Sequence, residues 1–484
     1  MLGAWPLIPR QLGCVQSGTH LAEPDNMKIP GQLWFPMVSA LALSACEASN
    51  TGESGASKSP TASASGPSGT SASSGAAGSG STSPTLALGG ATGASGTAAT
   101  PTVTTTTATE AQPPTAAGQL TAGTWDDNLN FSFYSSYLAA TAESQLAGMP
   151  LIGRSDRMVI LVKSADAQPV AGAQVTVSDG QGHVWSSLTG AEGRVLYFPS
   201  WASVPAGAIV TITATVANLS VATTATAAAG TVELDFAQTA LPTVTALDLA
   251  FVIDSTGSMG DELSYVQSEL DAIVGGIAAQ FPGIAQRWAL VVYRDEGDVY
   301  VVRSFDFTTD LASFRKNLAA QAADNGGDMP EAVDQALAAA TKLGWNGGST
   351  ARVAFWIADA PHHVGREASL ISALAAATTK AIHIYPVAAS GIDDLGEFTM
   401  RTAAEVTGGR NLFLTNDSGI GGGHAEPHIP CYYVTTLASA MRRMVATEVM
   451  GVYMAPASVD ILRTGGDPQN QQCTLSSGEP VTAW

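Results

Sequence analysis

The stretch from Phe251 to Gly260 constrains the fold of this chain more than any other part of its sequence. An apolar run that begins at Leu247 ends abruptly in Asp254, hydroxyl side chains follow at Thr256 and Ser258, and a helical pattern begins directly afterwards. A buried strand that delivers a carboxylate and two hydroxyls to the edge of a sheet predicts a site for a hard divalent cation, because such ions prefer oxygen ligands. Open α/β sheets bind their ligands beyond the carboxyl ends of their strands.

Apolar strands alternate with helical segments from residue 246 to about residue 449. Strands separated by helices predict a doubly wound, mostly parallel α/β sheet. A short apolar run at 300–306 follows the strand at 288–293 through the acidic turn 295–298. Because this connection is too short for a parallel crossover, we expect 300–306 to be an antiparallel edge strand.

Two further segments complete the pattern that begins at Asp254. Gly326 to Ala332 opens a helix, and Arg352 to Asp359 is a second apolar strand that ends in an acid. Together the three segments resemble the metal-ion-dependent adhesion site (MIDAS) of von Willebrand factor type A (VWA) domains, whose signature is Asp-x-Ser/Thr-x-Ser. The resemblance covers residues 244–455 and implies a Rossmann-like α/β fold with an adhesion or interaction function. The alternative is that the three acids merely cap helices.

The resemblance also implies a ligand set for one Mg²⁺ or Ca²⁺ ion. Thr256 and Ser258 would bind the ion directly, and Asp254 and Asp359 would act directly or through water. Where the family usually has a threonine on the middle loop, this chain has Asp328, which would either bind the ion or cap the following helix. A third carboxylate would lower the net positive charge at the ion and weaken its attraction for an acidic ligand.

Three rival sites compete with this interpretation. A zinc site could be formed by histidines and a cysteine: His362, His363, His424, His428 and Cys431. Pro427 breaks any helix there, so the helix-borne signature of zinc proteases is absent. A triad of Ser258, His362 and Asp359 lacks the strained strand–serine–helix turn of such hydrolases. The acid-rich loop 293–298 could hold a second Ca²⁺, with a solvated turn as the alternative. We therefore expect a protein that is not an enzyme.

Between residues 121 and 243 the hydrophobic period changes to two. Alternating runs are separated by glycine turns: 158–162, 173–177, 195–198, 209–216 and 232–236. Short strands without intervening helices predict a small antiparallel, Ig-like sandwich. The runs 169–177 and 189–193 resemble those of carboxypeptidase-regulatory or transthyretin-like sandwiches. No catalytic or metal-ligating constellation occurs in this region, which indicates a spacer or an accessory adhesive module.

Residues 1–46 have the pattern of a bacterial presequence, with a true start possible at Met27. The apolar run 33–45 is too short to span a membrane and is typical of a signal peptide. The sequence Leu-Ser-Ala-Cys that ends at Cys46 resembles a lipoprotein box, which implies a lipid anchor on that cysteine. An ordinary secretory signal is the alternative. Glu47 is not the aspartate associated with inner-membrane retention, so we expect outer-membrane anchoring, with the domains in the periplasm or at the cell surface.

Residues 47–120 are rich in Ser, Thr, Gly, Ala and Pro and contain no aromatic residue. Such a segment cannot bury enough apolar surface to offset chain entropy, so it predicts a flexible stalk. Cys431 and Cys473 are an even pair in an exported protein and predict a disulfide that fastens the C-terminal tail, 456–484. Two free thiols are the alternative.

The formal charge of −20 argues against nucleic-acid binding, which needs clustered Lys and Arg. We expect a surface-anchored lipoprotein whose VWA domain binds a protein or glycan ligand through the ion, with an acidic group of the ligand at the open position. An envelope-assembly or scaffold protein with a purely structural ion is the alternative, and a hydrolase is the remaining one.

Overall fold

The computed structural model describes residues 120–327 and 329–484. These residues lie in one compact unit, 102–484. The predicted presequence with Cys46, the predicted stalk up to residue 119, and Asp328 lie outside the described residues. Within the described part of the chain, no helix is long and apolar enough to cross a membrane.

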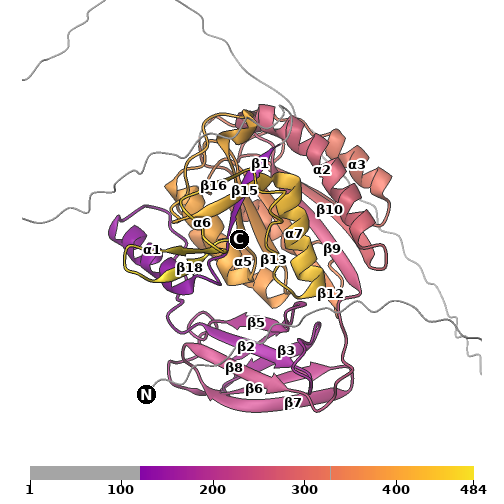
Figure 1. Cartoon of the computed structure of the whole chain (residues 1–484), viewed down its shortest axis with the longest axis vertical. Helices are drawn as coiled ribbons and strands as arrows, with labels where there is room; N and C mark the ends of the chain where they lie inside the picture. The colour runs from indigo at the N-terminus through magenta and orange to yellow at the C-terminus, as the bar shows by residue number, and fades with distance from the viewer. Residues whose placement is uncertain (1–119, 328) are drawn as a thin grey trace, which may run out of the picture. The chain divides into compact units, whose positions relative to one another are not determined.

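The largest sheet of the described chain is a mixed sheet of nine strands in the order β11-β10-β9-β12-β13-β14-β1-β15-β16 (Figure 1). Its strands are β1 (Thr121–Trp125), β9 (Ala246–Asp254), β10 (Ala285–Tyr293), β11 (Val302–Thr308), β12 (Thr350–Ala358), β13 (His383–Ala388), β14 (Asn411–Leu414), β15 (Tyr432–Thr436) and β16 (Arg463–Gly465). Five adjacent strands run parallel: β10, β9, β12, β13 and β14. The predicted antiparallel edge strand is confirmed as β11. The other pairings are antiparallel, so the sheet is less parallel than predicted.

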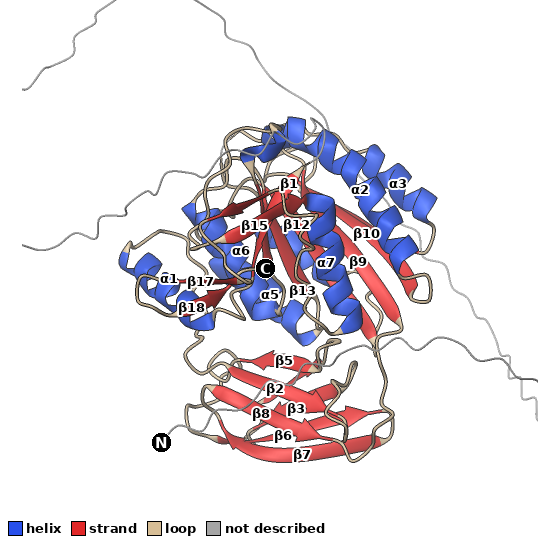
Figure 2. Ribbon diagram, viewed as in Figure 1, coloured by secondary structure: helices blue, strands red, loops and turns tan. Residues whose placement is uncertain are grey.

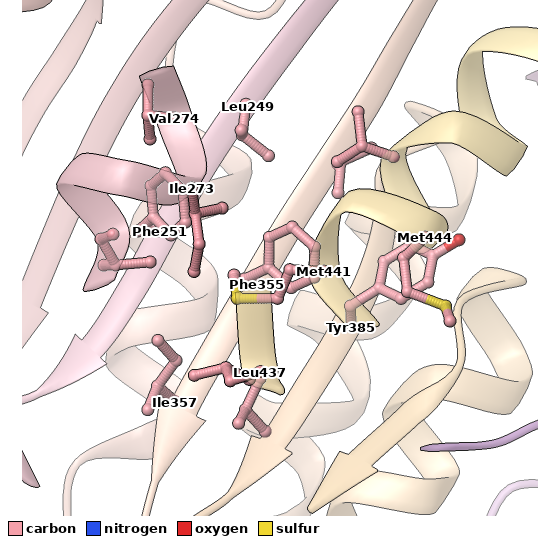
Figure 3. Packing of buried hydrophobic residues seen from close by; sticks show 14 of the residues in the cluster. Leu249, Phe251, Ile273, Val274, Phe355, Ile357, Tyr385, Leu437, Met441 and Met444 are labelled. Atoms are coloured by element: carbon pink, nitrogen blue, oxygen red, sulfur yellow. The ribbon is translucent and has the colours of Figure 1, made fainter. Parts of the chain in front are cut away.

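Helices cover both faces of this sheet, as the alternation of strands and helices predicts (Figure 2). They are α2 (Gly260–Gln280), α3 (Leu311–Ala319), α4 (Val333–Thr341), α5 (Glu367–Thr379), α6 (Asp394–Thr407) and α7 (Leu437–Met450). Phe251 of β9 packs in a cluster that includes residues of α2 and α7, such as Ile273 and Met441 (Figure 3). Val252 packs in a second cluster with residues of α4 to α6. Burial on both faces explains why β9 is apolar without alternation from Leu249 to Ile253.

Strand β1 belongs to the large sheet, although the sequence placed residues 121–125 at the start of the β-sandwich segment. It pairs antiparallel with β14 on one side and β15 on the other. Gly123 permits this insertion, because a Cβ there would lie 2.3 Å from the Phe413 ring and 2.9 Å from the Tyr432 ring. The misassignment arose because both partner strands are remote in sequence. Helix α1 (Phe131–Glu143) follows β1.

Two smaller sheets occupy the segment between α1 and β9. One has the order β5-β2-β8 and the other β4-β3-β6-β7. Their strands are β2 (Met158–Lys163), β3 (Gln174–Ser178), β4 (Val184–Leu188), β5 (Arg194–Tyr197), β6 (Ile209–Val216), β7 (Leu219–Thr226) and β8 (Gly230–Asp235). Side chains of both sheets share one hydrophobic cluster, with Ile160 and Ile212 among its members. β2 and β8 pair in parallel, which differs from the antiparallel arrangement expected.

A disulfide joins Cys431 to Cys473. Cys473 lies in β17 (Gln472–Thr474), which pairs antiparallel with β18 (Pro480–Thr482). Both cysteines pack with Trp125 in one small hydrophobic cluster. The bond therefore fastens the C-terminal tail beside β1.

Candidate functional site

Asp254 is the last residue of β9, and its side chain begins a chain of polar contacts. Its Oδ1 accepts hydrogen bonds from the Thr256 amide at 3.0 Å and from the Thr256 hydroxyl at 2.7 Å. The Thr256 hydroxyl lies 3.2 Å from the Ser258 hydroxyl. Asp254 and Thr256 are buried, whereas Ser258 is exposed in the short 3-10 helix η1 (Gly257–Met259). The local sequence thus leads from a buried carboxylate to a surface hydroxyl directly before α2.

Asp359 directly follows β12, the neighbour of β9 in the sheet. Ser258, Glu331 and Asp359 line one open cleft with a volume of about 660 Å³. Four of the predicted ligands, Asp254, Thr256, Ser258 and Asp359, are therefore gathered at the same edge of the sheet. The predicted ligand Asp328 lies outside the described residues, so its role stays a prediction.

The carboxyl groups at this edge destabilise one another's charged forms. Burial, followed by the charge of Asp359, raises the pKa of Asp254 to about 7. Burial, followed by the charge of Asp254, raises the pKa of Glu331 to about 9. Within the described residues, Asp254 Oδ2 and Glu331 Oε2 are buried oxygens without a hydrogen-bond partner. A bound cation would favour the charged form of each carboxyl group.

The donor set suits an ion that keeps part of its water shell. Among the described residues, no three His, Cys, Asp or Glu side chains come close enough together to hold a metal ion by themselves. Mg²⁺ usually retains several waters and takes only one or two carboxylates from a protein. The carboxylates of Asp254 and Asp359 and the hydroxyls of Thr256 and Ser258 fit that requirement.

Sequence reasoning missed the position of Glu331. The segment from Gly326 to Ala332 was expected to open a helix, but α4 (Val333–Thr341) begins only after it. The Glu331 amide instead donates to the Pro361 carbonyl at 2.9 Å, and the residue forms an isolated bridge with His362. This bridge explains why an acid that resembles a first-turn helix residue lies in the cleft, 1% exposed.

The acid-rich loop after β10 helps to hold the loops around the cleft. The Asp298 carboxylate accepts from the Gly326 amide at 3.3 Å and from the Asp295 amide at 3.2 Å. Asp295 Oδ1 lies 2.5 Å from His363 Nε2. These contacts give the loop a structural role, and a second Ca²⁺ there stays a prediction.

The structure contradicts the two rival sites built on histidine. Cys431 is bonded to Cys473 and cannot ligate zinc, and His428 Nδ1 lies 2.8 Å from Glu397. Both ring nitrogens of His362 have other partners, because Nε2 lies 2.9 Å from the Gly148 carbonyl and Nδ1 lies 3.2 Å from the Thr399 hydroxyl. His362 therefore does not serve Ser258 as a general base.

Residues 248–394 match the family model of the von Willebrand factor A domain. The chain thus contains a VWA domain, which is generally an interaction module. The matched segment begins inside β9 and ends at the start of α6. It contains all four predicted ligands that the structure describes.

An ariadne-like RING finger protein of Acanthamoeba polyphaga mimivirus is 34% identical to this chain over 120 residues. The match covers 24% of this chain and only 11% of the length of that relative. BatB of Bacteroides thetaiotaomicron is 14% identical, with 42% of this chain and 98% of that chain covered at a TM-score of 0.31. A von Willebrand factor type A structure from Catenulispora acidiphila is 16% identical, with 63% of this chain and 51% of that chain covered at a TM-score of 0.30.

Proposed function

We propose that the VWA domain binds a protein or glycan partner through one Mg²⁺ or Ca²⁺ ion held at the cleft, without catalysis. The observation that carries this proposal is the unbroken series of oxygen atoms from Asp254 through Thr256 to Ser258, which opens into the cleft lined by Asp359. Oxygen donors of this kind suit hard cations. The bound ion would supply an electrophilic position for an acidic group of the partner.

Each side chain has a distinct role in this proposal. Thr256 and Ser258 bind the ion directly, and Asp254 orients the Thr256 hydroxyl through the hydrogen bond at 2.7 Å. Asp254 and Asp359 balance the charge of the ion directly or through water. Asp328 adds a third carboxylate if it reaches the ion, which would weaken the attraction for an acidic partner.

The partner would be met at a membrane surface. We propose that Cys46 carries a lipid anchor in the outer membrane and that residues 47–119 act as a tether. Many tethered copies would engage one surface together, so that weak single sites give firm attachment.

A capture experiment with the full chain tests this function. The protein is incubated with cells or matrix in Mg²⁺ or in EDTA, and its fold is followed by circular dichroism. We expect EDTA and Ser258→Ala to abolish capture while the fold survives. Ser264→Ala is the matched control, because this exposed hydroxyl on α2 only contacts the Gly260 carbonyl, at 3.4 Å. Capture that survives EDTA would contradict the proposal, and loss of fold in EDTA would favour a scaffold with a structural ion.

A further inference from the structure

The cleft is lined by glycines of two kinds. Gly326 and Gly391 have φ angles of +72° and +94°, which side-chain-bearing residues rarely adopt. The backbone therefore requires glycine at these positions. Gly327, Gly422 and Gly423 also line the cleft, yet none of them has a left-handed φ.

Neighbouring atoms do not require glycine at the second kind of position either. A Cβ at Gly327 or Gly423 would meet nothing within 4 Å, and a Cβ at Gly422 would make only ordinary contacts of 3.8 Å with Ser390. Glycine in place of alanine costs conformational entropy on folding. The fold therefore gives no reason for these three glycines, and the space that they leave open lies in the cleft.

One wall of this space is fixed by a buried glutamate that the sequence did not reveal. Glu262 of α2 is fully buried, and its Oε1 accepts from the Ser390 amide at 3.0 Å. The same oxygen lies 3.2 Å from His424 Nε2, and the Gly422 amide donates to the Ser390 hydroxyl at 3.2 Å. These contacts hold the segment before His424 in place, so the open space is a built feature.

A second observation shows that the cleft is suited to a ligand. Glu331 is 1% exposed and lines the cleft, and its Oε2 has no hydrogen-bond partner within the described residues.

The described residues that line the cleft include no aromatic ring, so a sugar would find no stacking surface there. A polypeptide main chain needs no such surface, and it can approach closely where Cβ atoms are missing.

We propose that Gly327, Gly422 and Gly423 determine specificity, by admitting the main chain of an extended protein segment whose acidic side chain reaches the ion. Glu262 is the positioning residue that holds Gly422 and Gly423 at the edge of this open space. The inference rests on the proposed function and chooses a protein over a glycan as the partner.

The test uses the full chain and a variant that carries Gly327→Ala, Gly422→Ala and Gly423→Ala together. Gly283→Ala is the matched control, because a Cβ there also meets nothing within 4 Å but the residue lies outside the cleft, before β10. Calorimetry measures the affinity for Mg²⁺ alone. NMR titrations in the presence of Mg²⁺ then measure the affinities for acetate, glucuronate and the capped tripeptide Ala-Asp-Ala.

We expect the wild-type chain to bind the tripeptide more tightly than glucuronate. In the triple variant the affinity for the tripeptide should fall by about tenfold or more, whereas the affinities for Mg²⁺ and acetate should not change. The Gly283→Ala control should bind all of them like the wild type. An equal loss for acetate and tripeptide, no loss for either, or tighter binding of glucuronate would overturn the inference while leaving the proposed function standing. Failure of the wild-type chain to bind Mg²⁺ would overturn the proposed function and this inference with it.

Discussion

Asp127 and Arg401 form an ion pair that is almost completely removed from solvent, with side chains 1% and 0% exposed. The guanidinium donates two hydrogen bonds, at 2.8 and 2.9 Å, to the two carboxylate oxygens. Without Asp127, Arg401 would keep only one carboxylate partner among the described residues, Glu397 at 3.0 Å. Loss of one partner from a buried ion pair typically costs about 3–5 kcal/mol. We therefore expect Asp127→Ala to lower the free energy of unfolding by about 3–5 kcal/mol in urea titrations.

The control for this prediction is Asp271→Ala. Asp271 pairs with Arg315 at the surface, with side chains 52% and 42% exposed. Exposed pairs contribute less than about 1 kcal/mol, so this change should be small. Equal effects of the two substitutions would contradict the structural role of Asp127.

Glu269 predicts a pH dependence of stability. Burial raises its pKa to about 7 from a usual value of 4.5, although the Leu120 amide donates to its carboxylate. Because the pKa is raised on folding, the contribution of Glu269 to stability is complete below pH 4.5 and is lost as pH rises through about 7. The melting temperature of Glu269→Gln minus that of the wild type should therefore increase from about pH 5 to about pH 8. A constant difference would contradict this account.

The sequence predicted the helices and strands whose signal lies in their own residues. β9 is apolar from Leu249 to Ile253 and β12 from Val353 to Ala358, because both faces of each strand are buried there. An acid follows each run directly, so the position of the strands and of the site at their ends could be predicted. β1 and β15 were missed because their pairing depends on residues far away in the sequence. β7 was missed because it consists largely of small or polar residues whose alternation is weak. β4 was missed because its apolar residues, Val184, Trp185 and Leu188, do not alternate with polar ones.

In the candidate site, too, groupings within one segment could be predicted from the sequence, whereas contacts between distant segments could not. Asp254, Thr256 and Ser258 lie at alternate positions in one short segment that begins at the end of β9, so their grouping could be inferred from their spacing. Glu262 and Glu331 could not be assigned, because their contacts are with Ser390 and Pro361. Only the folded chain brings those loops together.

The insertion of β1 predicts where the VWA domain can be cut. A chain that begins at residue 244, the boundary expected from sequence, would lack the strand between β14 and β15. Both of these strands would then expose unpaired backbone groups. We expect this chain to lack a cooperative thermal transition, whereas a chain that begins at residue 118 should keep it. Equal cooperativity of the two in calorimetry would show that β1 is dispensable.

A lipid anchor on Cys46, as proposed, would decide where the whole molecule operates. If Cys46 is the lipidated first residue, intact-mass analysis of the membrane-extracted protein should find an acylated N-terminus there. Cys46→Ser should then release the protein from the membrane. A mature N-terminus without lipid would contradict the anchor and leave the cation site untouched.

We propose that the full chain holds a divalent cation at Asp254. Asp254→Asn keeps an oxygen that can accept from Thr256 but removes the carboxylate charge. Isothermal calorimetry measures the affinity of the folded wild-type chain and of this variant for Mg²⁺. We expect a single site in the wild type and a loss of affinity of about a hundredfold or more in the variant, equivalent to about 2.7 kcal/mol. Equal Mg²⁺ affinity in the two folded proteins would contradict the claim.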